Sequence, residues 1–426
     1  MSFPCYPKYK DSGVEWLGQV PEHWEVKRLK RACHVFPSNV DKKSYADETP
    51  VLLCNYTDVY YNEAIMSGME FMPATATAEQ IEKFTLRAGD TIITKDSETA
   101  DDIAIAAYVP ADLPGVVCGY HLSMVRPFNG TEGAFVKRLF DSAYARASFE
   151  VLANGLTRVG LGQHELDNVD LPFPPATEQT RIAAFLDQET AKIDALVAKQ
   201  KRLIELLIEK VKCLVLSSFD LPETKQLRFG SVAQIISRPV TQKEDEEYAR
   251  IGLYNKGRGL FHREASEKDD MGDSDFFWVE EGDLIISGQF AWEGAVALAS
   301  EDDTGCVVSH RFPVLRGVPG VSFTEYLFAL LLTEHGDFLL NENSRGAAGR
   351  NRPLNITALL KEKIPLPSLK IQQAVVNAVH YKKQLLVEIS KQIDLLQERR
   401  TALISAAVTG QIDVRQVLNS PAATKN

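Results

Sequence analysis

The sequence predicts an α+β chain in which two similar domains, related by pseudo-two-fold symmetry, are separated by two long antiparallel helices that form a coiled-coil spacer. Three observations predict this class. The chain repeats itself at a fixed offset, each repeat ends in a Pro-x-Pro sequence, and a long proline-free segment with helical periodicity follows each of these sequences.

The internal repeat rests on two pairs of segments with one common offset. Residues 86–94 resemble residues 279–287, and Gly282 lies 193 residues after its counterpart Gly89. Residues 171–174 resemble residues 364–367 at the same offset of 193 residues. Between these anchors, residues 117–126 resemble residues 307–316 with a small slip. We infer two halves of about 190 residues each.

Each domain combines short apolar runs with turn residues and one helical segment. In the first domain, residues 51–55, 91–94 and 103–109 are predicted strands, and residues 135–153 a helix. In the second, residues 283–287, 295–299 and 306–309 are predicted strands, and residues 323–340 a helix. The Gly-Asp pair before one strand in each half is typical of a turn rather than of a catalytic carboxylate.

The predicted boundaries follow from this order. Residues 1–21 form an N-terminal segment, 22–170 the first domain, 171–220 the first long helix, 221–363 the second domain, 364–415 the second long helix, and 416–426 a flexible tail.

The two long segments carry an apolar stripe with heptad-like spacing. We expect the first helix to have its N-cap at Thr177 and the second to begin after Ser368. The predicted seam consists of Ile193, Leu196, Gln200, Leu203 and Leu207 in the first helix, and Leu386, Ile389, Ile393, Leu396 and Arg400 in the second. Because a helix of about 35–40 residues cannot bury such a stripe within its own domain, we expect the two stripes to pack together.

Composition narrows the functional classes. The formal net charge is −11, which argues against a protein that coats DNA non-specifically. The six cysteines form no Cys-x-x-Cys pair, so neither a zinc site nor a disulfide framework is expected. No apolar run is long enough to span a membrane and no secretory signal is present, so we expect a cytoplasmic protein without membrane contact.

Three segments resemble the specificity subunits of type I restriction-modification systems. They are residues 9–29 with Val20-Pro21-Glu22-His23-Trp24, residues 171–186 with Thr177-Glu178-Gln179, and residues 403–414 with Ala406-Ala407-Val408-Thr409-Gly410. The resemblance covers nearly the whole chain in order and spacing, and is weak inside the two domains. The second helix lacks the Glu-Gln pair with which the first begins.

The resemblance implies two target recognition domains, each recognising one half of a bipartite site in double-stranded DNA, with the helices setting the gap. It also implies docking of two modification subunits, which methylate adenine, and of restriction subunits with translocase and nuclease activity. S-adenosylmethionine, ATP and Mg²⁺ are then expected on the partner subunits and no cofactor or metal on this chain.

The sequence itself offers no catalytic motif. The chain contains neither a Gly-x-x-x-x-Gly-Lys-Ser/Thr loop nor an Asp/Asn-Pro-Pro-aromatic motif. We therefore expect a non-catalytic subunit. Two alternatives stay open: a coiled-coil scaffold with two interaction modules and no DNA role, and the specificity subunit of a related system in which modification and cleavage are fused in one partner.

Candidate DNA contacts are polar or basic residues in loops, because base edges and phosphates are bound by such side chains. The most basic loop holds Arg345, Arg350, Asn351 and Arg352 between glycines and alanines. The other candidates are Lys95, Arg158 and Gln163 in the first half, and Lys256, Arg258, Gln289 and Trp292 in the second.

Overall fold

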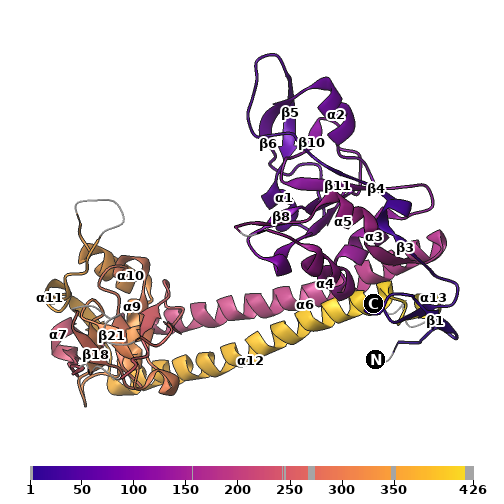
Figure 1. The fold of residues 1–426 in the computed structure, drawn as a ribbon. Coiled ribbons are helices and arrows are strands. Elements are labelled where there is room, and N and C mark those ends of the chain that lie inside the picture. Colours follow the sequence, from indigo (N-terminus) through magenta and orange to yellow (C-terminus); the bar gives the residue numbers. More distant parts are fainter. Residues whose placement is uncertain are drawn as a thin grey trace. The chain divides into compact units, whose positions relative to one another are not determined.

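The computed structural model describes residues 3–155, 157–241, 243, 246–266, 274–346 and 352–417. The chain divides into two compact units, the first made of Met1–Ala198 with Ile393–Asn426 and the second of Lys199–Gln392. Each unit holds one domain together with one end of each long helix (Figure 1). Strands and helices mix in both units, so the predicted α+β class is confirmed. Within the described ranges, no helix is long and apolar enough to cross a membrane.

A four-stranded antiparallel sheet forms the frame of each domain. In the first unit the order is β4 (Cys33–Pro37), β11 (Leu122–Pro127), β7 (Thr91–Thr94) and β9 (Ala106–Tyr108). In the second it is β15 (Ala233–Ile235), β22 (Val314–Gly317), β19 (Leu284–Ile286) and β20 (Val296–Leu298). The Gly-Asp turns precede β7 and β19, and Gly89 and Gly282 have φ angles of +93° and +81°. Glycine adopts this left-handed conformation without strain, which explains why both halves carry it there.

A smaller sheet lies beside the first in each domain. In the first unit β5 (Thr49–Cys54) pairs in parallel with β10 (Val116–Cys118) and antiparallel with β6 (Met72–Ala76). In the second unit β16 (Ile251–Leu253) pairs with β17 (Leu260–His262), and β21 (Val307–Ser309) pairs with β18 (Phe276–Trp278). A parallel bridge from Arg250 to Val307 joins these two pairs. The two domains therefore share the four-stranded frame, while their smaller sheets pair differently.

The helices predicted at 135–153 and 323–340 are each two helices, so both predictions are wrong about continuity. The first is α3 (Gly133–Phe140) and α4 (Ala143–Leu152), and the second is α9 (Thr324–Leu331) and α10 (Glu334–Glu342). Ser142 and Thr333 cap the second helix of each pair by accepting hydrogen bonds from the backbone N–H groups three residues on. The apolar pattern runs across both breaks because both helices of each pair contribute to one core.

Short elements complete the domains. The pair β3 (Glu25–Arg28) and β13 (Asp170–Phe173) in the first unit matches β14 (Lys225–Arg228) and β23 (Lys363–Leu366) in the second. The first unit further contains β1 (Tyr9–Asp11), β2 (Gln19–Pro21), η1 (Leu29–Arg31), α1 (Tyr56–Tyr60), α2 (Ala78–Phe84), β8 (Asp96–Ser97), η2 (Ala100–Asp102), β12 (Val159–Gly160), α5 (Gln163–Asn168) and α13 (Val414–Val417). The second contains α7 (Phe229–Val232), η3 (Ala291–Glu293), η4 (Glu301–Asp303) and α11 (Ile356–Leu359). Of the predicted flexible tail, residues 418–426 lie outside the described residues.

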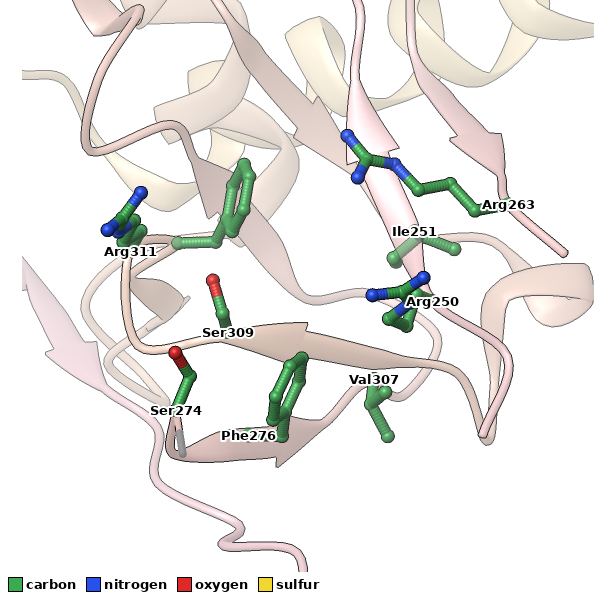
Figure 2. Close-up of a pocket in the computed structure, with 9 residues that line it drawn as sticks. Arg250, Ile251, Arg263, Ser274, Phe276, Val307, Ser309 and Arg311 are labelled. Atoms are coloured by element: carbon green, nitrogen blue, oxygen red, sulfur yellow. The ribbon is translucent and has the colours of Figure 1, made fainter. Parts of the chain in front are cut away.

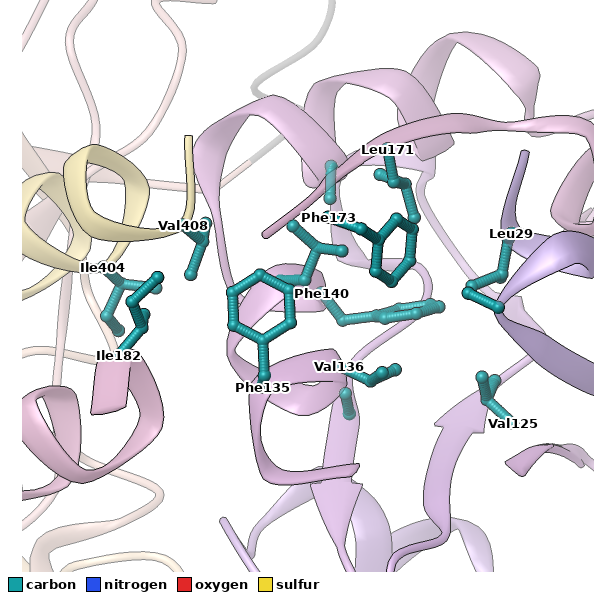
Figure 3. Close-up of a cluster of buried hydrophobic side chains, with 14 of the residues drawn as sticks. Leu29, Val125, Phe135, Val136, Phe140, Leu171, Phe173, Ile182, Ile404 and Val408 are labelled. Carbon is teal, nitrogen blue, oxygen red and sulfur yellow. The ribbon is translucent and has the colours of Figure 1, made fainter. Parts of the chain in front are cut away.

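The long helices are α6 (Ala176–Ser217) and α12 (Leu369–Val408). α12 begins directly after Ser368, as predicted, whereas α6 begins at Ala176, so Thr177 lies inside the helix and is not its N-cap. In the first unit, the beginning of α6 packs antiparallel against the end of α12, with Ile182 beside Ile404 (Figure 3). In the second unit, the end of α6 shares an apolar cluster with the beginning of α12.

The predicted seam residues of α12 are all buried or half-buried, whereas those of α6 are divided. Ile193 and Ile389 are buried, but Leu196 is 48% exposed and Leu203 is 41% exposed. Val197 and Ile204 are half-buried in their place. After Ile193, a heptad pattern can continue either three residues later, at Leu196, or four residues later, at Val197. Only packing against the partner helix decides that the stripe continues at Val197.

Both polar positions of the seam have partners in the structure. Gln200 donates a hydrogen bond to Gln392, with 2.9 Å between Nε2 and Oε1. Arg400 pairs with Asp194 at 3.0 Å and with Glu63 at 2.9 Å. Polar pairs of this kind disfavour other registers of two packed helices, because a shifted register leaves them unpaired.

The core of the first unit runs without interruption from the sheet into the helices. Phe135, Phe140 and Phe173 lie at its middle, between Val125 on the sheet side and Ile404 on α12 (Figure 3). Removal of a buried aromatic ring of this kind costs about 3–5 kcal/mol. The domain and the helix ends of this unit therefore form one packed body.

Two polar contacts recur in both units and fix each frame. The first is a buried aspartate directly before the central strand. Asp90 accepts two hydrogen bonds from Arg126, both at 2.7 Å, and Asp283 accepts from Arg316 at 2.6 Å and from Arg238 at 2.8 Å. The Gly-Asp pair is thus a turn, as predicted, whose carboxylate also neutralises an arginine of the neighbouring strand.

The second recurring contact is a glutamine in the first turn of each long helix. Gln179 accepts from the backbone N–H of Glu132 at 2.8 Å and donates to the carbonyl of Pro174 at 2.8 Å. Gln372 accepts from the N–H of Phe323 at 3.0 Å and donates to the carbonyl of Pro367 at 2.9 Å. The second helix therefore keeps the glutamine of the Glu-Gln pair and lacks only the glutamate, which Ile371 replaces.

That glutamate, Glu178, organises the N-terminal segment in the first unit. It is buried and accepts hydrogen bonds from the hydroxyl of Tyr6 and from Trp24 Nε1 at 3.1 Å, and it pairs with His23 at 2.8 Å. Burial and the contact with Glu178 raise the pKa of Tyr6 above its ordinary range. The C-terminal segment contacts this N-terminal segment, because Asp413 donates its backbone N–H to the carbonyl of Pro4 at 2.7 Å.

Candidate nucleic-acid interface

Each domain has a surface hollow at the turn that connects its smaller sheet to its main sheet. In the first unit the turn joins β10 to β11, and the hollow of about 200 Å³ is lined by Asp41, Lys42, Asn55, Tyr56, Gly119, Tyr120 and His121. His121 Nδ1 lies 2.7 Å from Asp96 Oδ2. The ammonium of Lys95 lies 4.7 Å from the centre of the Tyr120 ring. Burial lowers the pKa of Lys95. The hollow thus offers both acidic and basic groups beside aromatic rings.

In the second unit the equivalent turn joins β21 to β22 and the chemistry is different. A hollow of about 230 Å³ is lined by Arg250, Ile251, Arg263, Ser274, Phe276, Val307, Ser309, Arg311 and Phe312 (Figure 2). A neighbouring hollow of about 260 Å³ shares Arg263, Arg311 and Phe312 with it and adds Asn255, Gln289 and Phe290. The two hollows adjoin at these shared residues, and we call the pair the arginine groove.

The predicted contacts of the first half fall at different places. Lys95 lies next to the hollow, and Arg158 is exposed on the loop before β12. Gln163 donates its side-chain amide to the carbonyl of Val35 at 3.1 Å, so part of its hydrogen-bonding capacity serves the fold.

The predicted contacts of the second half divide into two groups. Gln289 is exposed and lines the arginine groove. Lys256, Arg258 and Trp292 instead line a separate cavity of about 780 Å³ next to α6 and α12, together with Lys212 and Lys382. The sequence neighbours Gln289 and Trp292 therefore contribute to different sites.

The basic loop predicted at residues 345–352 is only partly described. Arg345 pairs with Glu342 at 2.8 Å, and the Arg352 guanidinium lies over the Trp292 ring at 4.9 Å from its centre. Arg350 and Asn351 lie outside the described residues.

Sequence analysis missed the arginines of the groove. Arg250 precedes β16, Arg263 follows β17 and Arg311 lies before β22. Because they are spread over 62 positions of the sequence, no local basic cluster marks them. The one property of these arginines that the sequence could have shown is that they lie near the ends of strands. Loops of an α+β domain meet in space at such places.

Glu63 links the first domain to the helix ends within its unit. It contacts Lys137, pairs with Arg138 at 3.1 Å and with Arg400 of α12 at 2.9 Å. Burial acts to raise the pKa of Glu63, but the three cations outweigh it and lower that pKa to about 2. The carboxylate therefore stays ionised at pH values at which an ordinary glutamate is already protonated.

Comparison with known proteins places the chain in a family. Residues 21–206 and 222–396 each match the family model of the type I restriction modification DNA specificity domain. The putative type I restriction enzyme MjaX specificity subunit of Methanocaldococcus jannaschii is 21% identical over 433 residues, which cover 94% of this chain and 96% of that protein.

Solved structures with similar folds include a chain from work on complex assembly and conformational transition of the type I R-M system. It has a TM-score of 0.57 and 18% identity, and the match covers 92% of this chain and 99% of the other. The HsdS subunit of Thermoanaerobacter tengcongensis is 20% identical, with a TM-score of 0.44 over 92% of this chain and 98% of that one. The double family match covers well over half of the sequence, and the chain belongs to the family of type I restriction-modification DNA specificity proteins.

Proposed function

We propose that this chain is the DNA sequence-specificity subunit of a type I restriction-modification complex. In this proposal each domain recognises one half of a bipartite site in double-stranded DNA. The long helices set the gap between the half-sites and dock two modification subunits. One observation carries the proposal: two domains share a frame, yet differ in the chemistry of the hollow at the same turn. Such divergence on a common frame is expected when two modules bind different sequences.

The proposal assigns the chemistry to partner subunits. Adenine methylation with S-adenosylmethionine, and ATP- and Mg²⁺-dependent translocation and cleavage, take place on the modification and restriction subunits. The present chain contributes recognition and assembly. Its net charge of −11 supports this division, because a subunit with that charge depends on local basic surfaces and on partners for phosphate contacts.

A domain exchange tests the proposal. Residues 22–170 are replaced by the equivalent part of a relative, the variant is assembled with its modification subunits, and methylated adenines are mapped across a genome. We expect one half of the methylated site to change and the other half to stay. A change in both halves or in neither would contradict modular recognition. Absence of any sequence-dependent methylation by the unmodified complex would favour a scaffold without a DNA role.

A further inference from the structure

The arginines of the groove in the second unit differ from the other arginines of that domain. Arg238 and Arg316 pair with Asp283, and Arg345 pairs with Glu342. In the described part of the chain, no carboxylate lies within 4 Å of the guanidinium of Arg250, Arg263 or Arg311. Among the described residues, three like charges thus line one hollow without a carboxylate partner.

Arg250 provides a second, independent observation. Its Nε atom is buried and has no hydrogen-bond partner among the described residues. A buried guanidinium N–H without an acceptor is unfavourable, and native structures rarely keep one without a purpose. The backbone of Arg250 is placed beside this hollow by its bridge to Val307 of β21. An acceptor that enters the hollow would satisfy this donor.

The walls of the hollow select an anion. Ser274 and Ser309 bring hydroxyl groups, whereas Phe276 and Val307 add apolar surface (Figure 2). Phe312 also lines the hollow. Guanidinium groups bind phosphate oxygens with paired N–H donors, and an apolar wall strengthens that interaction. The volume of about 230 Å³ admits a phosphate group with its ester linkages.

Given the DNA-recognition function proposed above, we propose that Arg250, Arg263 and Arg311 clamp a backbone phosphodiester of the bound DNA. The neighbouring hollow shares two of these arginines and is also lined by Gln289 and Asn255, so it adjoins the clamp. A clamped phosphate places the adjoining base edges beside Gln289, whose amide can both donate to and accept from a base. The clamp therefore fixes the position of the DNA backbone, and Gln289 in the neighbouring hollow contacts the bases.

The test measures DNA binding by the full chain assembled with its modification subunits. R311Q and R263Q are compared with R228Q, which removes one charge from an exposed arginine of β14 outside the groove. Dissociation constants are measured for a duplex with the complex's own methylation site and for an unrelated duplex, over a series of salt concentrations.

We expect R311Q and R263Q to bind both duplexes roughly tenfold more weakly, as expected when one charge-assisted contact is lost. The slope of log K against log salt is expected to fall by about 0.9 for each lost phosphate contact. The methylated sequence stays the same, and R228Q changes neither quantity. R250Q is expected to weaken binding without lowering the melting temperature, since Arg250 Nε has no hydrogen-bond partner among the described residues.

Three results would overturn the clamp. The first is an unchanged affinity and salt slope in R311Q and R263Q. The second is a relaxed preference at one base position with an unchanged slope, which would assign the arginines to a base. The third is millimolar binding of inorganic phosphate that R311Q abolishes while DNA binding persists. If the wild-type complex showed no sequence preference, the proposed function would be refuted. The difference in salt slope between the wild type and the arginine variants would still test the clamp in that case.

Discussion

The two domains are most alike where the chain is buried and least alike where it is open. The aspartate before the central strand and the glutamine in the first helical turn recur with the same partners in both. The hollow at the connecting turn instead holds His121, Lys42 and Asp41 in one domain and three arginines in the other. Duplication has preserved the contacts that hold the frame, and the exposed turn has diverged.

A second difference concerns how each domain meets the helix ends of its own unit. In the first unit Glu63 and Arg400 bridge them by ion pairs, whereas in the second a cavity of about 780 Å³ occupies the space next to α6 and α12. The ion-pair bridge through Glu63 and Arg400 thus belongs to one copy, while the glutamine contacts and the apolar clusters recur in both.

The largest expected effect comes from the buried aspartates. D283A removes the buried acceptor that Arg238 and Arg316 share and is expected to cost about 3–5 kcal/mol, whereas D90A removes the buried acceptor of Arg126 alone and is expected to cost less. Urea unfolding of the full chain, with each unit followed separately by hydrogen exchange, measures both. An equal loss in the two variants would show that the second arginine at Asp283 adds nothing.

The glutamines of the first helical turns are expected to be equivalent. Q179A and Q372A each remove a partner from buried backbone groups, at a cost of about 1–3 kcal/mol. Q373A, at an exposed neighbouring position, is the matched control and is expected to stay within about 0.5 kcal/mol of the wild type. Thermal unfolding of the three variants tests this, and a harmless Q372A would mean that the second copy has lost the contact.

The Glu63 bridge is expected to make the first unit sensitive to acid. Its pKa in the folded state is about 2, below the ordinary value of 4.5. Its contribution is therefore present above pH 4.5 and is lost as the pH falls toward 2. Because the side chain is 55% exposed, solvent screens the ion pairs, and E63Q is expected to cost only about 0.5–1 kcal/mol at pH 7. The gap between wild type and E63Q in urea unfolding should narrow from pH 5 to pH 3, and a constant gap would contradict this.

The smallest effect is expected at the polar pair of the helix seam. Replacement of both Gln200 and Gln392 by leucine is expected to stabilise the second unit by up to about 1 kcal/mol, since apolar seam positions pack better. The single variant Q200L leaves Gln392 without its partner and is expected to gain less. Melting temperatures of the single and double variants compare them, and a destabilised double variant would show that the glutamines contribute more than register.

Much of the frame could be predicted from the sequence because it depends on local patterns. The strands at 91–94 and 306–309, the start of α12 after Ser368 and the Gly-Asp turns all follow from residue types and their spacing. The predicted single helices were wrong, because apolar periodicity continues through the caps at Ser142 and Thr333. The seam of α6 was half wrong for a related reason, since only the partner helix distinguishes Val197 from Leu196.

The candidate site was harder to predict than the frame. Of the predicted DNA contacts in the second half, Gln289 lines the arginine groove, while Lys256, Arg258 and Trp292 line another cavity. The groove collects Arg250, Arg263 and Arg311 from three loops, and distance in the sequence conceals their convergence.

By itself, the sequence determined the duplication, the α+β class, the two long helices and the family resemblance, because periodicity, turn residues and repeated segments are properties of the chain taken in order. Only the tertiary structure decided which arginines have counter-charges, which seam residues are buried and which loops share a hollow. These depend on side chains from distant segments meeting in space, and the free energy of burying a charge is fixed by the groups that surround it.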